Sequence, residues 1–286
     1  MMALDLPALN ARLHAAAPLI QNITNTVVQQ FSANVLLAVG AAPAMLDHEA
    51  DAGQFARLAN GILINFGTAT NQQLLAADAA IRVANQMGKP WVLDPVSVGV
   101  IDFRTTRIQQ AAECHPSVIR GNASEIAALA GQGAGGRGVD STDEVDAVLV
   151  AAMSLAQSTG AVVAVSGARD AIVEVSDSTV RLARVGGGHP LMPRVIGTGC
   201  SLGSLTAAYL AAQRAPDGRR LASDFDATIA AHAHFKLAGE AAGKTTSGPG
   251  SFAVAFVDAL YALQSADLAR ADVHLEIREM PDTCGL

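Results

Sequence analysis

The stretch VIGTGCSLG at residues 195–203 combines a Gly-Thr-Gly turn, a cysteine and the start of an apolar helical run. Gly197 and Gly199 flank Thr198, and glycine permits the backbone angles that let a turn wrap around an anion. The helix that follows presents free N–H groups and a partial positive charge. This pattern predicts a phosphate site. A glycine-rich connection whose helix packs through small residues is the alternative interpretation.

Three charged residues supply the rest of a phosphate site. Arg120 lies near the end of the buried run SVIRGN, where a guanidinium needs an acid or a phosphate as partner. Asp94 is either a turn former before Pro95 or, with Glu125, a ligand of Mg²⁺, which takes one or two carboxylates plus water and substrate phosphates. Asn122 and Glu125 also have the spacing of a capping box, which explains both without catalysis. Because the chain has no GxxxxGK[ST] motif, this nucleotide-phosphate site would lack a Walker A loop.

Cys200 directly follows the Gly-Thr-Gly turn, at a position where a phosphoryl-transfer enzyme is expected to have a carboxylate. A thiol at a helix N-terminus is predicted to have a lowered pKa and some thiolate character. Phosphoryl transfer depends more on positioning and charge than on early proton removal. We therefore expect Cys200 to act as a modest base or a hydroxyl-positioning group, not as a covalent nucleophile. His189 is a candidate dyad partner, although its context GGGHPLM is typical of a loop.

From residue 60 onward, short apolar runs alternate with amphipathic segments. The runs at 61–66, 90–95, 117–122 and 161–167 are typical of buried strands; the segments at 70–90, 105–114, 123–131 and from Ser141 through Leu155 are typical of helices. Thr70 with Gln73, and Ser141 with Glu144, have capping-box spacing. This alternation predicts an α/β fold with a largely parallel sheet and helices on both faces. Ligands of such sheets bind beyond the carboxyl ends of the strands, where the polar candidates above fall.

The pattern then changes. The runs at 171–175 and 179–185 predict an antiparallel hairpin at the edge of the sheet, and everything after Gly199 reads as long helices. The last helix is expected to follow SGPG, with Ser251 as its cap. No internal repeat or linker divides the chain, so residues 1–286 are expected to form a single domain.

Composition narrows the function classes. With a net charge of −7 and acids and bases intermixed, the chain has no basic stripe for nucleic acid. No apolar stretch reaches the roughly 20 residues of a membrane span, and no signal peptide is recognisable. The three cysteines are far apart, which favours a reducing cytoplasm over a disulfide framework. His232 and His234 face different sides of a helix and are expected to be ordinary helix residues, not a metal pair.

Taken together, these motifs resemble the hydroxyethylthiazole kinase family of the ribokinase-like superfamily. The stretches that carry the resemblance span about Pro18 to Leu263: QNITNTVV, GAAPAM, INFGT, LDPVSVG, RGNASEI, GHPLMPRVIGTGCSLGS and GPGSFAVAFVDALYAL. The resemblance implies transfer of the γ-phosphate of ATP to the hydroxyl of 4-methyl-5-(2-hydroxyethyl)thiazole, a thiamine salvage step. It also implies Mg²⁺ and a homotrimer with active sites between subunits.

By position, the resemblance assigns the following roles: thiazole contact to Asn25, Met45 and Gly197, ATP-phosphate contact to Arg120, Ser166, Thr198 and Gly199, metal-and-phosphate carboxylates to Asp94 and Glu125, and the place beside the reacting hydroxyl to Cys200. Met45 is equally explained as a core methionine. Ser166 replaces an expected threonine, and Ser97 replaces a usual glycine.

Two rival functions remain at this point. A dehydratase that uses ATP or ADP to repair hydrated nicotinamide cofactors has a similar scaffold, but such proteins carry aspartate at the position of Cys200. A non-catalytic sensor of nucleotide or thiazole would use the same pocket.

Overall fold

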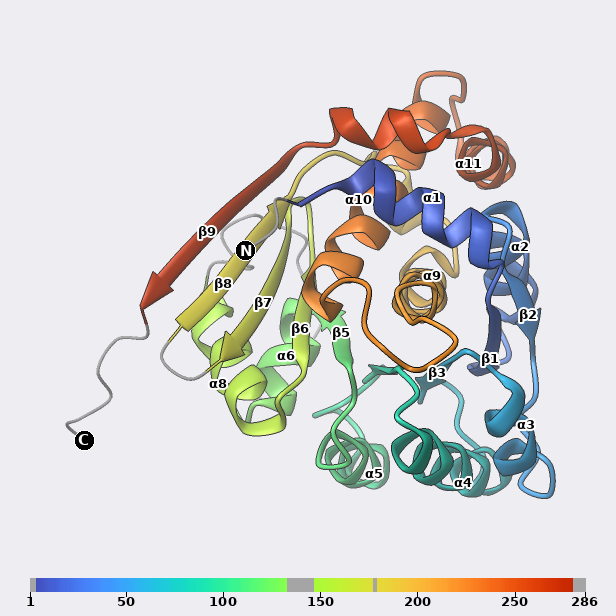
Figure 1. The fold of residues 1–286 in the computed structure, drawn as a ribbon, viewed down its shortest axis with the longest axis vertical. Helices are drawn as coiled ribbons and strands as arrows, with labels where there is room; N and C mark the ends of the chain where they lie inside the picture. Colours follow the sequence, from blue (N-terminus) through green and yellow to red (C-terminus); the bar gives the residue numbers. More distant parts are fainter. Residues whose placement is uncertain (1–3, 133–146, 177–178, 280–286) are drawn as a thin grey trace.

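The fold is built on one twisted sheet (Figure 1). The computed structural model describes residues 4–132, 147–176 and 179–279. Within them the strand order is β2-β1-β3-β4-β5-β6-β7-β8-β9. The strands are β1 (Leu19–Ile23), β2 (Ala42–Ala44), β3 (Gly61–Asn65), β4 (Trp91–Asp94), β5 (Val118–Asn122), β6 (Val162–Ser166), β7 (Asp170–Ser176), β8 (Thr179–Val185) and β9 (Val273–Glu279). Pairing is parallel from β2 to β6 and antiparallel from β6 to β9.

Helices cover both faces of this sheet (Figure 1). One layer contains α1 (Leu6–Ala16), α2 (Gln29–Ala38), α9 (Thr198–Ala212), α10 (Asp224–Gly243) and α11 (Pro249–Ala262), with the short 3₁₀ helices η1 (Met192–Arg194) and η2 (Ser265–Arg270). The other contains α3 (Ala52–Leu58), α4 (Asn71–Met87), α5 (Asp102–Ala112), α6 (Ala123–Leu129) and α8 (Leu149–Thr159). The α/β fold predicted from the alternating pattern is therefore confirmed.

The two cores arise from the period-two alternation of the strands. In β3, Leu63 packs with α9 and α10 residues in one core, while Ile62 and Ile64 pack with α4 residues in the other. Because both strand faces are covered, the central strands are apolar throughout, as the sequence runs required. Gly203 lets α9 lie close to the sheet, since a Cβ there would lie 2.9 Å from Leu63.

Local signals placed several helix ends correctly. Thr70 and Gln73 form the capping box of α4, and Gly88 ends that helix in the left-handed conformation. Asn122 and Glu125 form the capping box of α6. The strands predicted at 61–66, 90–95, 117–122 and 161–167 correspond to β3, β4, β5 and β6. The expected Ser141 and Glu144 cap lies outside the described residues.

Three local predictions were wrong. The chain after Gly199 is not all helical, because β9 pairs with β8 and occupies the sheet edge where the β7–β8 hairpin was expected. Ser251 is not the cap of α11: Gly248 is the N-cap, Pro249 opens the helix, and the Ser251 hydroxyl donates back to the Gly248 carbonyl. The helix predicted from residue 105 already begins at Asp102.

The long-range reason for the missed strand is pairing. β9 has seven partners on β8 in a regular antiparallel register, although its own side chains are mostly exposed. A strand with so little buried surface carries a weak hydrophobic pattern. Among the described residues, no helix has the length and apolar character needed to cross a membrane.

Candidate active site

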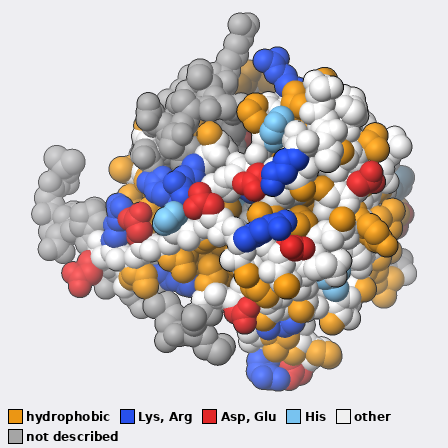
Figure 2. Space-filling view, turned by 90° about the horizontal axis from the view of Figure 1, so that it is seen from above, with side chains coloured by type: hydrophobic (Ala, Val, Ile, Leu, Met, Phe, Trp, Pro, Cys, Tyr) orange, Lys and Arg blue, Asp and Glu red, His pale blue; other side chains and the backbone are white. Residues whose placement is uncertain are grey.

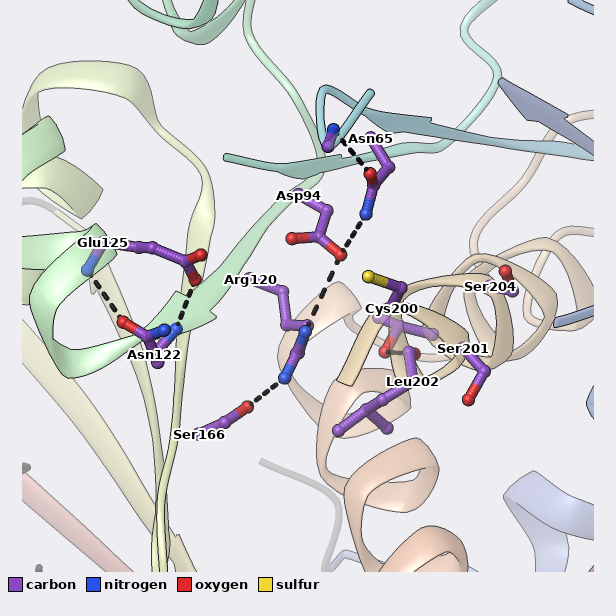
Figure 3. Close-up of polar contacts among 12 residues, drawn as sticks. Asn65, Asp94, Arg120, Asn122, Glu125, Ser166, Cys200, Ser201, Leu202 and Ser204 are labelled. Carbon is purple, nitrogen blue, oxygen red and sulfur yellow. Dashed lines mark hydrogen bonds and ion pairs between the residues drawn. The ribbon is translucent and has the colours of Figure 1, made fainter. Parts of the chain in front are cut away.

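A pocket of about 950 Å³ lies at the carboxyl ends of the parallel strands, between the sheet and the start of α9. Nine of the residues singled out in the sequence line it: Asp94, Arg120, Asn122, Glu125, Ser166, His189, Thr198, Gly199 and Cys200. They come from β4, β5, α6, β6, α9 and the segment between β8 and η1, which lie far apart in the chain. Figure 3 shows Asp94, Arg120, Ser166 and Cys200 facing one another.

The Gly-Thr-Gly turn forms the N-terminus of α9. Gly197 is the N-cap with φ of +95°, a conformation that favours glycine, and a Cβ there would lie 3.0 Å from Phe31. The Thr198 hydroxyl donates to the Met192 carbonyl at 2.8 Å, which ties the turn to η1. The first intrahelical bond runs from Ser201 N–H to the Gly197 carbonyl at 2.8 Å. The Thr198 amide donates to the Val195 carbonyl, so the Gly199 and Cys200 amides form the open first turn of the helix and suit an anion.

Arg120 reaches across the pocket from β5. Its Nη2 donates to Ser166 Oγ at 2.6 Å, and its Nη1 lies 3.7 Å from Asp94 Oδ2. Both terminal nitrogens lie 3.9 Å from where a side chain on Gly199 would begin. The guanidinium therefore faces the open end of α9, so that a phosphate held there would meet both a helix N-terminus and a charged fork.

Of the two acids next to Arg120, Asp94 is fully buried and Glu125 is half-buried. Burial raises the pKa of Asp94 to about 7; Arg120 and the bond from Asn65 oppose this rise, and Glu125 adds to it. Burial likewise raises the pKa of Glu125, against the Asn122 amide and Arg120. The capping box explains the place of Glu125 in α6, and it leaves the side chain lining the pocket. The structure is therefore compatible with both sequence interpretations of Glu125, as a capping residue and as a metal ligand.

Cys200 departs from its predicted chemistry. Burial raises the pKa of its thiol to about 11, and the nearby Asp94 charge adds to the effect; bonds from Asn65 and Asn25 and the Arg120 charge oppose it. The predicted lowering was wrong, because removal from water outweighs the field of the helix N-terminus here. At neutral pH the group is a thiol, which argues against general-base chemistry. His189 lines the same pocket, but its ring stacks on Phe252 at 5.4 Å, and among the described residues it makes no hydrogen bond with Cys200.

Two asparagines connect Cys200 to the acids. Asn25, which follows β1, donates from Nδ2 to Cys200 Sγ at 3.2 Å and to Asn65 Oδ1 at 3.1 Å. Asn65, the last residue of β3, donates from Nδ2 to Asp94 Oδ2 at 2.7 Å. Neither Asn25 nor Gly197 lines the pocket itself: Asn25 contacts the pocket-lining Cys200, and Gly197 precedes the pocket-lining Thr198. Met45 is not among the residues that line it; Met45 follows β2 at the sheet edge.

A second buried charge cluster supports the loop after Ser166. Asp170 lies 3.1 Å from Lys236 Nζ and 2.8 Å from His232 Nδ1, and Lys236 Nζ also donates to the Gly167 carbonyl at 2.7 Å. Burial works against ionisation, but the Lys236 charge, His232 and the Gly167 amide together lower the pKa of Asp170 to about 2. This cluster fixes the loop that carries Ser166.

Sequence reasoning missed Lys236 and the roles of Asp170 and His232. His232 is fully buried and its Nδ1 contacts Asp170, while its Nε2 has no hydrogen-bond partner among the described residues. His234 is also fully buried, and its Nδ1 lies 3.0 Å from the Tyr209 hydroxyl. Both are therefore ordinary structural histidines, as expected, but neither is solvated. The one signal for this cluster was the acid at the end of SGARD, since no sequence pattern pairs it with a lysine on a distant helix.

The donor set can be tested against Mg²⁺. Within the described residues no three His, Cys, Asp or Glu side chains cluster as a metal cage. Asp94 and Glu125 nevertheless offer two carboxylates on one side of a pocket whose other side suits a phosphate. Mg²⁺ commonly binds through one or two carboxylates, water and substrate phosphates, so the residues present fit this ion.

Ser97 lies in the loop after β4 and explains why glycine is usual there. Its φ is +70°, in the left-handed region that a side chain disfavours. The Ser97 amide also hydrogen-bonds Glu125 and lowers its pKa slightly against the effect of burial. The side chain is therefore accommodated in a strained conformation at the edge of the pocket.

The fold and the pocket define a ribokinase-like phosphotransferase. Solved structures support the fold: a pyridoxal kinase from Staphylococcus aureus bound to AMP-PCP has a TM-score of 0.61 at 16% identity and covers 91% of this chain and 99% of its own. The chain belongs to the hydroxyethylthiazole kinase family, whose sequence model matches residues 11–266.

Close relatives agree with that membership. The chain is 54% identical over 252 residues to the hydroxyethylthiazole kinase of Corynebacterium glutamicum, covering 88% of this chain and 91% of that protein. It is 50% identical over 257 residues to the enzyme of the same name from Corynebacterium efficiens, covering 90% and 92%. The structure of the hydroxyethylthiazole kinase protein from Pyrococcus horikoshii has a TM-score of 0.83 at 33% identity, covering 95% of this chain and 98% of that one.

Proposed function

We propose that this protein transfers the γ-phosphate of ATP to the hydroxyl of 4-methyl-5-(2-hydroxyethyl)thiazole, a step of thiamine salvage. The observation that carries the proposal is the convergence of Arg120, Ser166 and the open first turn of α9 on one pocket that also contains two carboxylates. Family membership supplies the substrate class.

The chain's own residues account for transfer by positioning and charge. Arg120, Ser166, Thr198 and Gly199 bind the phosphoryl oxygens, and the amides of α9 stabilise the charge on the group in transit. The bond from the alcohol oxygen to phosphorus forms as the bond to the leaving oxygen of ADP breaks. Mg²⁺, held by Asp94 and Glu125, would neutralise charge on the phosphates.

Cys200 acts in this scheme as a positioning group and not as a base. Its thiol is un-ionised at neutral pH, since the pKa is about 11. The hydroxyl proton therefore leaves late, to an oxygen of the transferred phosphoryl group, which is compatible with a loose transition state. Asn25 Nδ2 donates to the Cys200 thiol at 3.2 Å. We place the thiazole alcohol beside these two residues, in contact with Gly197.

We also propose a cytoplasmic homotrimer with the active site at the subunit interface, and one kinase domain over residues 1–286. Exposed apolar side chains on α2 and α11 and in the segments before α2 and α9 support the interface: Val27, Leu37, Ile196, Val254 and Tyr261. Figure 2 shows apolar side chains gathering on the side where Figure 1 places α2 and α11. Met45 at the edge strand β2 would complete the thiazole contact at this interface. On the same view basic and acidic groups are interspersed, which disfavours nucleic acid as a partner.

The experiment is a coupled assay of ADP release with ATP, Mg²⁺ and a panel of hydroxyethyl heterocycles. We expect turnover with the thiazole alcohol and none in excess EDTA. Full activity in EDTA would contradict the roles given to Asp94 and Glu125. Dehydration of hydrated nicotinamide cofactor, with no phosphorylated alcohol, would favour the dehydratase, and binding without turnover would favour a sensor.

A further inference from the structure

Asn65 joins the two halves of the candidate active site. Its side chain is 5% exposed and contacts residues of both halves, as Figure 3 shows for Asp94. One end of the amide faces Asn25 and, beyond it, Cys200; the other end faces Asp94 and, beyond it, Arg120. None of the roles given above to phosphate, metal or alcohol contacts involves Asn65.

The orientation of this amide is fixed by the backbone. Asn65 Oδ1 accepts from Gly67 N–H at 2.9 Å, and a backbone N–H can only donate. The opposite end must therefore be the Nδ2 donor, which meets Asp94 Oδ2 at 2.7 Å. The Asp94 oxygen is thus held as an acceptor, in a position set by main chain two residues beyond Asn65.

The same logic fixes Asn25. The remaining acceptor capacity of Asn65 Oδ1 is used by Asn25 Nδ2 at 3.1 Å, so Asn25 also presents Nδ2 to Cys200 Sγ. Asn25 Oδ1 is left buried and, within the described part of the chain, without a hydrogen-bond partner. Such an atom is costly to bury unless a ligand supplies a donor. The alcohol hydroxyl is a donor of that kind.

We propose that Asn65 is a positioning residue that sets the hydrogen-bond direction across the site and couples the alcohol side to the phosphate side. The proposal rests on the proposed function, since it assigns the alcohol to Asn25 and the phosphate to Asp94 and Arg120. Gly67 is part of this device: a Cβ there would lie 2.8 Å from Asn25. Loss of Asn65 therefore affects both substrates, although it touches neither.

The test uses calorimetric binding of the thiazole alcohol and of ATP with Mg²⁺, alongside turnover, for Asn65→Ala and Asn65→Asp. Asn65→Asp keeps the shape but replaces the donor facing Asp94 with an acceptor, so two carboxylate oxygens would meet at hydrogen-bond distance. We expect a loss of about 100-fold in kcat/KM and weaker binding of both ligands. Asn65→Ala should weaken both by a smaller factor.

A matched control is available in α4. Asn85 also uses both ends of its amide, donating to the Cys114 carbonyl at 2.8 Å and accepting from Trp91 Nε1 at 3.0 Å. Unlike Asp94, the partner of Asn65, neither of these partners lines the pocket. Asn85→Asp should leave both affinities unchanged. A merely structural role for Asn65 would lower the melting temperature of both variants while folded protein kept wild-type affinities, and that result would overturn the proposal.

A double-mutant cycle separates coupling from two independent losses. If Asn65 orients Asn25, removing Asn65 should matter less once Asn25 is already gone. The affinity of the Asn25→Ala, Asn65→Ala double variant for the alcohol should then be at least about fivefold higher than the value obtained by multiplying the two single-variant losses. Additive losses would overturn the proposal. If Asn65→Asp does not fold, Asn65→Ala and the cycle decide. Absence of turnover in the wild type, with the binding cycle intact, would contradict the proposed function and leave this inference supported.

Discussion

Asp94 and Asp170 are equally buried, at 1% exposure, and both lie at the edge of the sheet where the parallel strands end. Their pKa values are nevertheless shifted in opposite directions. The pKa of Asp94 is raised to about 7, because burial is only partly offset by Arg120 at 3.7 Å and Glu125 adds repulsion. The pKa of Asp170 is lowered to about 2, because Lys236 at 3.1 Å and His232 outweigh the same burial.

The difference indicates that Asp170 has a structural role and Asp94 a chemical one. At Asp170 the carboxylate is paired with Lys236, which also holds the loop by donating to the Gly167 carbonyl. The Asp94 side has two carboxyls beside one guanidinium, and both carboxyls have raised pKa values, so added positive charge would favour their ionised forms. A metal ion is a source of such charge. The nearby Ser97 also has a disfavoured φ of +70°.

The largest expected effect is on Arg120, the cation of the unbalanced side. Arg120→Ala should lower kcat/KM by about 10²- to 10³-fold, because the phosphoryl charge loses its fork and Asp94 loses its nearest cation. Steady-state kinetics with ATP measure this. Arg107→Ala is the control: it breaks the 2.5 Å ion pair between Arg107 and Asp78, which are not pocket-lining residues, and should keep full activity.

The balanced side should respond in stability. Asp170→Asn leaves Lys236 buried without its counter-ion and should cost about 3 kcal/mol of unfolding free energy, measured by urea titration at pH 7. The pKa of Asp170 is depressed in the fold, so its stabilisation is present above about pH 4 and is lost as pH falls toward 2. The variant should lack this acid-dependent loss. Equal pH profiles for both proteins would contradict the comparison.

Asp94→Asn should change the free energy of unfolding in the opposite direction from Asp170→Asn. Because the pKa of Asp94 is raised from 3.8 to about 7, the folded wild type binds the extra proton and loses stability as pH rises from about 4 to about 7. The variant should be more stable at pH 8 without Mg²⁺, by on the order of 1–3 kcal/mol, while losing turnover. Thermal melts at pH 5 and pH 8 test the sign, and a destabilised variant at pH 8 would break the contrast.

Cys200→Ala should have a smaller effect, since a thiol with a pKa of about 11 is not a base at neutral pH. We expect a loss of about tenfold or less in kcat, far below that of Arg120→Ala, and we expect Cys200→Asp to retain activity. Complete inactivity of folded Cys200→Ala beside an active Arg120 variant would reverse the assignment. Alkylation of Cys200, followed by peptide mass spectrometry, should be slow below pH 9.

Ser97→Gly is the smallest change. Ser97 has φ of +70°, and glycine should relieve about 1 kcal/mol of strain, raising the melting temperature by a few degrees. Gly99 has φ of +79°, so Gly99→Ala in the same loop is the matched control and should lower it. No gain in Ser97→Gly would mean that the strain attributed to the Asp94 side is absent.

Much of the parallel half of the fold follows from sequence patterns that act locally. The runs that became β3 to β6 are short and apolar, and the caps at Thr70 and Asn122 are satisfied within four residues. β9 was missed because its formation depends on pairing with β8, almost one hundred residues earlier. The start of α11 was misplaced because Ser251 resembles a cap, whereas Pro249 fits the first helical turn.

The candidate site divides in the same way. Residue type and position were enough to select Asp94 and Arg120 at strand ends, and Cys200 after the glycine turn. The role of Ser166 was assigned by the family resemblance. The protonation of Cys200 was predicted wrongly, because it depends on burial and on Asp94, which approach it only in the folded chain. Asn65 as a bridge and Lys236 as a counter-ion were not predicted at all, because each acts through partners from other elements.

The amino-acid sequence by itself therefore determined the α/β alternation, and it predicted which turn and which residues would bind phosphate and metal, because periodicity, glycine and charge act over short distances. Only the tertiary structure decided the ionisation of Asp94, Asp170 and Cys200 and the direction of the asparagine contacts. Electrostatic free energy depends on distance and burial in three dimensions, and neither is encoded in the spacing of residues along the chain.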